Sequence, residues 1–377
     1  MKTLMSSSVV EIVDELVDKA ISVGASDIHL ESTKDGLRIR FRIDGILHDK
    51  DTVSKDIADQ VISRIKVLAG IDISQRRIPQ DGKFKLESFL SPVILSELLG
   101  ESKDSTQIDF RVSTFPSLYG EKVVIRILDR GKQNIDLNSL GFSLETYKKF
   151  IKMISRPSGF ILVTGPTGAG KTTTLYAALS KLHTPDKNII TLEDPVEYAI
   201  DNITQGHIQT DAGFTFAQGI RALLRQDPDI AMIGEIRDRE SARIAIEASL
   251  TGHLVFSTLH TNNAASAIVR LMDMGIEPYL IKASLTGVLA QRLARKVCLQ
   301  CCGTGCKICD YLGYKGRTGI FELLEMTDRL AALISESPDS NQIQVQAIAD
   351  GMMTLAADAQ LKLQAGVISL EELNRTI

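Results

Sequence analysis

The sequence has 377 residues, of which 44% are hydrophobic, and this is enough for two domains with cores of their own. The formal net charge is −4 and no basic run stands out, which weighs against a general nucleic-acid binder. The sequence has no apolar stretch as long as a membrane span and no signal-peptide core at its N-terminus. We therefore expect a cytoplasmic protein that meets a membrane only through a partner.

The first 70 residues combine helical and strand patterns. Apolar positions recur at helical spacing over residues 9–23, which predicts an amphipathic helix. Residues 26–31 and 37–43 alternate apolar and polar side chains like half-buried strands, and every arginine of the second strand falls on one face. Asp44-Gly45 is typical of a hairpin turn, and a second helix is predicted over residues 54–68.

A small α+β domain is predicted to extend over residues 1–130 and to end in a linker at residues 131–140. Its other strands are expected at residues 84–86, 108–112 and 122–128. The apolar insert at residues 88–106 suggests an added helix or a contact surface and carries no predicted chemistry.

The second domain is predicted over residues 141–377, where strands and helices alternate around a mostly parallel sheet of the α/β class. Strands are expected at residues 160–164, 188–193, 230–235 and 253–259. Helices are expected at residues 171–182, 215–225, 239–250, 264–274, 278–293 and, in succession, over 322–377.

A complete G-x-x-x-x-G-K-[ST] motif at residues 165–172 predicts a nucleotide-binding phosphate loop. It follows a short apolar strand and precedes a helix, so backbone N–H groups and the helix N-terminus can bind phosphate. Lys171 is expected to reach the β- and γ-phosphates and Thr172 to hold Mg²⁺. The predicted nucleotide-binding residues are Gly165, Pro166, Thr167, Gly168, Ala169, Gly170, Lys171, Thr172 and Thr173.

Acidic residues end two of the predicted strands. Glu193 is expected to bind Mg²⁺ or to orient water. Glu235 is expected to supply a second metal contact or the base for the attacking water, and its length suits the role towards water. Arg237 and Arg239 follow Glu235 closely, and they either pair with acids of this site or form surface salt bridges.

Two histidines, His253 and His260, bracket the predicted strand at 253–259. A histidine near a γ-phosphate can donate a hydrogen bond and sense whether that phosphate is present. We therefore predict a functional role for both histidines, the alternative being that they are ordinary, satisfied polar residues.

All five cysteines lie between residues 298 and 309, and such clustering in a cytosolic chain favours a metal site over disulfides.

The sequence as a whole resembles the type II secretion and type IV pilus assembly ATPases, from about residue 9 to its end. The stretches that carry the resemblance are residues 25–29, 77–82, 120–122, 165–172, 191–197, 234–238 and 251–261. The resemblance implies a RecA-like P-loop ATPase domain, a PAS-like N-terminal domain, and a homo-hexameric motor. Such a motor would hydrolyse ATP to drive pilus or pseudopilus assembly, peripheral to the inner membrane through platform and anchoring proteins.

Site residues are also implied by the resemblance. The first domain of family members lends arginines to the nucleotide of a neighbouring subunit, and the matching residues are Arg40, Arg42 and Arg126. The paired acids of the family match Glu193 and Glu235, and its histidines match His253 and His260.

Two features depart from the family pattern. Family members carry a further N-terminal docking domain, whereas this sequence starts almost at the Ser-Asp-Ile-His stretch. The two Cys-x-x-Cys pairs are separated by four residues instead of a long insert. We still expect Cys298, Cys301, Cys306 and Cys309 to bind a structural Zn²⁺, with a metal-free, reduced loop as the alternative.

The cysteine pairs and the stretch at 77–82 favour assembly motors over the related retraction motors, which lack the cysteine element. A DNA-uptake or conjugation motor is the other alternative. No nucleic-acid partner is expected, and neither is direct insertion into a membrane.

Overall fold

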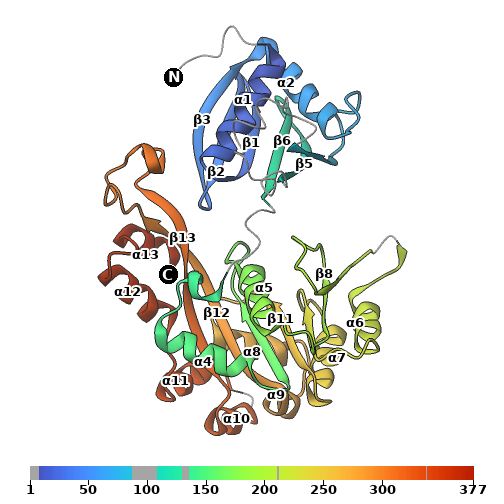
Figure 1. Cartoon of the computed structure of the whole chain (residues 1–377), viewed down its shortest axis with the longest axis vertical. Coiled ribbons are helices and arrows are strands. Elements are labelled where there is room, and N and C mark those ends of the chain that lie inside the picture. Colours follow the sequence, from blue (N-terminus) through green and yellow to red (C-terminus); the bar gives the residue numbers. More distant parts are fainter. Residues whose placement is uncertain (1–7, 87–107, 130–135, 210–211, 337) are drawn as a thin grey trace. The chain divides into compact units, whose positions relative to one another are not determined.

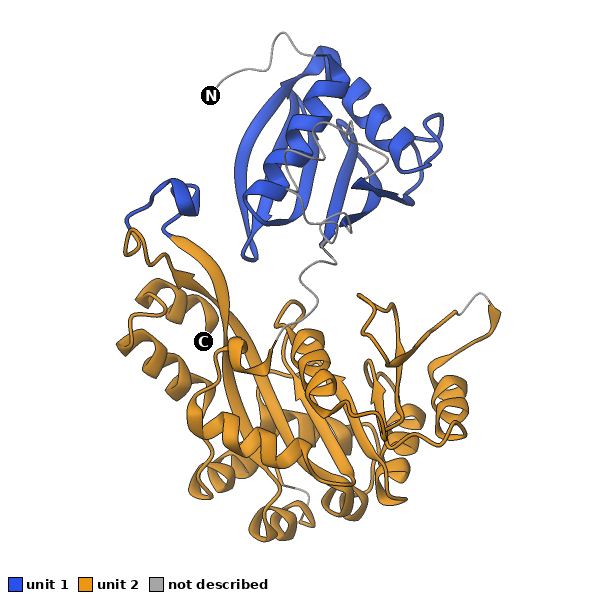
Figure 2. Cartoon of the chain, in the orientation of Figure 1, with its two compact units in different colours: residues 1–133, 304–313 blue, residues 134–303, 314–377 orange. Residues whose placement is uncertain are grey.

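The computed structural model describes residues 8–86, 108–129, 136–209, 212–336 and 338–377. The chain divides into two compact units, shown by colour in Figure 2. Unit 1 comprises residues 1–133 together with 304–313, and unit 2 comprises residues 134–303 and 314–377. The second half of the cysteine-rich segment thus groups with unit 1, whereas the sequence placed the whole segment in the second domain.

Unit 1 is an antiparallel sheet of six strands in the order β3-β2-β1-β6-β5-β4, with two helices packed on one face (Figure 1). The strands are β1 (Ala25–Thr33), β2 (Gly36–Ile43), β3 (Ile46–Ser54), β4 (Gln80–Lys85), β5 (Ile108–Ser117) and β6 (Gly120–Asp129). The helices are α1 (Val9–Ser22) and α2 (Lys55–Leu68).

The core of unit 1 follows from the alternation in its strands. Ile28 and Leu30 of β1 are fully buried and pack with the apolar faces of α1 and α2. Helix α1 begins at a capping box, in which the Glu11 N–H donates to Ser8 Oγ and the Ser8 N–H donates to the Glu11 carboxylate. The insert predicted at 88–106 lies outside the described residues.

Unit 2 is built on a sheet of seven strands in the order β13-β12-β7-β11-β10-β8-β9. All neighbouring strands are parallel except β12 and β13. The strands are β7 (Gly159–Thr164), β8 (Ile189–Glu193), β9 (Thr204–His207), β10 (Ile230–Ile233), β11 (Leu254–Leu259), β12 (Leu285–Val297) and β13 (Tyr314–Glu325).

Helices cover both faces of this sheet, and each face has its own apolar cluster. The helices are α4 (Leu144–Ile154), α5 (Lys171–Leu182), α6 (Phe216–Leu224), α7 (Arg239–Leu250), α8 (Ala264–Asp273), α9 (Pro278–Ser284), α10 (Asp328–Ile334), α11 (Ser340–Ala349), α12 (Leu355–Gln364) and α13 (Leu370–Thr376). Short 3-10 turns form at η4 (Leu137–Leu140) and η6 (Lys307–Cys309). In the part of the chain that the structure describes, no helix has both the length and the apolar composition that crossing a membrane requires.

Three of the predicted elements are wrong in part. The helix expected at 278–293 stops at Ser284, and the chain continues as the long strand β12. Every residue from Leu285 to Gln291 is buried. Because a mostly apolar run shows neither the period of a strand nor that of a helix, the sequence pattern could not tell the two apart here. The region from residue 322 is helical only after β13 ends at Glu325, and β10 ends two residues before Glu235.

Candidate active site and metal centre

The phosphate loop joins the end of β7 to the start of α5, as predicted. Three glycines of the loop have positive φ angles, namely +150° at Gly165, +78° at Gly168 and +85° at Gly170. A Cβ on Gly165 would lie 2.4 Å from the carbonyl oxygen of Gln291, so only glycine fits there. The Lys171 ammonium donates to the carbonyl oxygens of Gly165 (2.9 Å) and Pro166 (3.1 Å). Burial lowers the pKa of Lys171, so this cation would be stabilised by an anion in the loop.

Glu235 and His260 lie at the same edge of the sheet as the phosphate loop, because β7, β10 and β11 are parallel and each residue follows the C-terminal end of its strand. His260 Nε2 is 3.4 Å from Glu235 Oε2, and Arg237 forms an ion pair with the other carboxylate oxygen. The negative charge of Glu235 partly opposes the effect of burial on the pKa of Lys171. The structure therefore brings Lys171, Glu235 and His260 together.

Glu193, the last residue of β8, is only 3% exposed. Thr191 Oγ1 (2.6 Å) and Gln205 Nε2 (3.2 Å) donate to its Oε1, and the Tyr176 hydroxyl donates to its Oε2. Burial raises the pKa of Glu193, and these three hydrogen bonds oppose that shift. Three of the roughly four acceptor sites of this carboxylate are therefore occupied, which leaves little of it for a metal contact.

His253 is at the opposite edge of the sheet from the phosphate loop, so of the two histidines it is His260 that lies beside the loop of its own chain. The functional role of both histidines stays a prediction. His253 precedes the first residue of β11, a strand of six residues that spans about 20 Å. Its Nδ1 contacts the carbonyl oxygen of Ala248 at 2.9 Å, which is the ordinary satisfied state of a surface histidine.

The two arginines after Glu235 have different partners. Arg237 pairs with Glu235 and lies 3.7 Å from an oxygen of Asp194, so it belongs to the acidic site. Arg239 contacts Glu277 at 3.4 Å, and this is a surface ion pair.

The arginines expected to act on a neighbouring subunit lie on the polar face of the sheet of unit 1. Asp27 is shared by Arg42 (Nε to Oδ2, 3.6 Å) and Arg126 (Nε to Oδ1, 3.1 Å). Arg40 donates to Glu31 at 2.6 Å. Because Arg126 is 60% exposed, its guanidinium is accessible to an anion. The role of these arginines towards a nucleotide stays a prediction.

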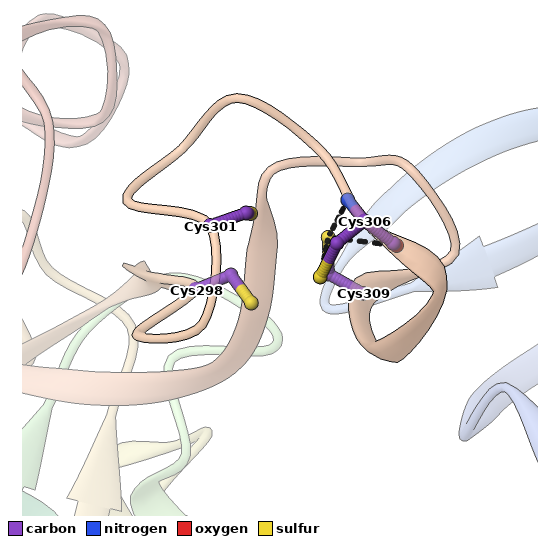
Figure 3. Close-up of side chains that lie close together, drawn as sticks. All are labelled: Cys298, Cys301, Cys306 and Cys309. Atoms are coloured by element: carbon purple, nitrogen blue, oxygen red, sulfur yellow. Dashed lines mark hydrogen bonds between the residues drawn. The ribbon is translucent and has the colours of Figure 1, made fainter.

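The four predicted metal ligands form a cluster, and Figure 3 shows the two cysteine pairs facing each other. The sulfur atoms of Cys298, Cys301, Cys306 and Cys309 all lie within 4.8 Å of one another, and none of these residues forms a disulfide. The Sγ atoms of Cys306 and Cys309 are 3.8 Å apart, which matches the edge of about 3.8 Å expected for tetrahedral zinc with Zn–S bonds near 2.3 Å. Backbone N–H groups of Cys306 and Gly313 donate to Cys309 Sγ, as they do to a thiolate ligand.

A phosphate loop between a parallel strand and a helix, with an acid that follows another parallel strand of the same sheet, defines a P-loop nucleoside triphosphatase. Comparisons with known proteins narrow this class. The family model described as "Type II/IV secretion system protein" matches residues 3–375. The chain therefore belongs to this family, and it is an ATPase of the motor class used in secretion and pilus assembly.

Two relatives illustrate the similarity in sequence. The chain is 44% identical to "Type II secretion system ATPase E" of Vibrio cholerae, over 97% of this chain and 75% of that protein. It is 42% identical to "Type IV pilus assembly ATPase PilB" of Myxococcus xanthus, over 98% and 68% of the respective chains. These matches confirm the predicted family and the ATPase activity.

Solved structures agree with the predicted fold. The Legionella pneumophila ATPase DotB superposes with a TM-score of 0.75 at 21% identity, covering 100% of this chain and 97% of that chain. The pilus retraction motor PilT with bound ADP superposes with a TM-score of 0.66 at 27% identity, covering 98% and 97%. The RecA-like ATPase fold with a smaller α+β domain is thereby confirmed.

Proposed function

We propose that this chain forms a homo-hexameric motor that hydrolyses ATP to drive assembly of a pilus or pseudopilus. It would work peripherally at the inner membrane, through platform and anchoring proteins of the secretion or pilus machine. The observation that supports this proposal most strongly is that Lys171, Glu235 and His260 meet at one sheet edge in a chain related to secretion and pilus assembly ATPases.

The roles proposed for the site residues rest on their positions in the phosphate loop and at the sheet edge. Lys171 would exchange the Gly165 and Pro166 carbonyls for phosphate oxygens, which removes the cost of burying an ammonium without an anion. Glu235 would accept a proton from the attacking water, and His260 would donate a hydrogen bond to the γ-phosphate. Thr172 would hold Mg²⁺, with Glu193 as a second contact, and the bound ion would neutralise charge on the phosphate oxygens.

The arginines of unit 1 would complete the site of an adjacent subunit. The guanidiniums of Arg42 and Arg126 share one carboxylate, that of Asp27, so their positive charge is only partly neutralised. Supplying Arg40, Arg42 or Arg126 to the γ-phosphate of a neighbour would make hydrolysis depend on assembly.

A structural Zn²⁺ held by Cys298, Cys301, Cys306 and Cys309 is also part of the proposal. Four thiolates leave no open position on the metal, so the ion would stabilise the loop and take no part in hydrolysis. The predicted link between this cysteine element and assembly motors favours assembly over retraction.

The experiment that tests the proposal combines sizing with an ATPase assay. We expect the protein to assemble into hexamers with a non-hydrolysable ATP analogue, and its specific activity to rise with protein concentration. Folded protein that stays monomeric with the analogue, or whose specific activity is independent of concentration, would contradict the proposal. Hydrolysis that is stimulated by DNA would instead favour a DNA-uptake motor.

A further inference from the structure

Strand β12, which the sequence did not predict, runs beside the phosphate loop. Its Ala290 pairs in parallel with Thr164, the last residue of β7, so Gln291 is next to the point where the loop starts. Gln291 is 3% exposed although its side chain is polar. Burying an amide without hydrogen bonds costs free energy, so buried amides are normally hydrogen-bonded. The partners of Gln291 therefore show which part of the chain it positions.

Both ends of the Gln291 amide are bound by the loop and its helix. Nε2 donates to the carbonyl oxygen of Ala169 at 2.7 Å, and Oε1 accepts from Thr174 Oγ1 at 2.7 Å. Thr174 is fully buried in the first turn of α5. A Cβ on Gly170 would lie 2.8 Å from Nε2, so this glycine is what lets the amide approach the loop.

The hydrogen bond to Ala169 fixes the direction of the next N–H group. The peptide between Ala169 and Gly170 is planar and trans, so its C=O and N–H point in opposite directions. Because the Ala169 carbonyl oxygen accepts from Gln291, the Gly170 N–H is turned away from the Gln291 amide. A loop of this type binds phosphate oxygens through its backbone N–H groups, so the direction of this N–H bears on nucleotide binding.

We propose that Gln291 is a positioning residue that sets the phosphate loop in its nucleotide-binding conformation by holding the Ala169 carbonyl. This inference rests on the proposed role of residues 165–172 in nucleotide binding. Gln291 itself touches no phosphate in this account and acts only through the peptide of Ala169 and Gly170.

The test compares Gln291→Met with Thr174→Val in the full-length chain. Gln291→Met keeps the length of the side chain and removes both hydrogen bonds, whereas Thr174→Val removes only the bond to Oε1. Affinity for a fluorescent ADP analogue, kcat and KM for ATP, and the unfolding temperature without nucleotide are measured for each variant. Lys171→Ala is included to test the loop itself.

We expect Gln291→Met to weaken ADP binding and raise KM about tenfold with kcat little changed, since a lost hydrogen bond affects ground state and transition state alike. Thr174→Val should change affinity less than about threefold, although both variants lose thermal stability. Equal affinities in Gln291→Met and wild type, with only the unfolding temperature lowered, would overturn the inference. If Lys171→Ala also binds ADP normally, the proposed role of the loop fails as well.

Discussion

Replacing Glu235 by glutamine separates the chemistry of the site from its stability. Glutamine has the same length and keeps an oxygen for Arg237, but it cannot take a proton from water. Because the Arg237 side chain is 59% exposed, the lost ion pair is worth at most about 1 kcal/mol of folding stability. Loss of a general base costs a factor of about 10² to 10⁴ in rate, or roughly 3–5 kcal/mol in the activation barrier.

The assay records kcat for phosphate release together with the affinity for a fluorescent ATP analogue and the unfolding temperature. We expect hydrolysis by Glu235→Gln to fall at least about a hundredfold, with affinity and unfolding temperature nearly unchanged. Hydrolysis close to the wild-type rate would refute the assignment and move the activation of water to Glu193. Glu193 would then act from a buried position in which Tyr176, Thr191 and Gln205 already donate to its carboxylate.

Three further predictions concern other parts of the chain. His260→Ala should lower kcat about tenfold, whereas His253→Ala, at the opposite sheet edge, should stay within about twofold in the same assay; equal losses would contradict the placement. Burial raises the pKa of Glu372, but hydrogen bonds from Arg375 and Arg295 outweigh burial and lower this pKa to about 2. The ionised Glu372 therefore stabilises the fold fully above its usual pKa of 4.5, and this stabilisation is lost as the pH falls from 4.5 towards 2. Urea unfolding should therefore show that Glu372→Gln lowers the free energy of unfolding by about 3 kcal/mol at about pH 7 and by only about 1 kcal/mol at about pH 3. A difference between variant and wild type that does not change with pH would contradict this prediction. Metal analysis should find about one zinc per wild-type chain and much less in Cys306→Ser, and sub-stoichiometric zinc in the wild type would argue for a metal-free loop.

The parts of the site that are local in sequence were predictable. The phosphate loop is one contiguous motif, and the position of Glu235 follows from the rule that parallel strands end at the same edge of a sheet. The same rule separates the two histidines, since His253 precedes its strand while His260 follows it. Strand direction was therefore a signal in the sequence that places His260, and not His253, at the edge that carries the phosphate loop.

Other features depend on residues that meet only in the folded chain. The enclosure of Glu193 needs Tyr176 from α5 and Gln205 from β9, and no spacing in the sequence indicates that the three meet. The role of Gln291 was hidden for another reason. It lies in an apolar run that is compatible with a helix, and only the register of β12 against β7 brings it to the phosphate loop.

The central claim is that a phosphate loop and the arginines of an adjacent subunit form one shared site, and mixing two inactive variants tests it most directly. Lys171→Ala keeps the arginines but has an inactive phosphate loop. The double variant Arg42→Ala, Arg126→Ala keeps an intact loop but lacks these two arginines. In a ring of head-to-tail contacts, equal mixing completes about one interface in four, so we expect up to about a quarter of the wild-type ATPase rate to return. A mixture that remains as inactive as its components, although both variants enter the same oligomers, would contradict the claim.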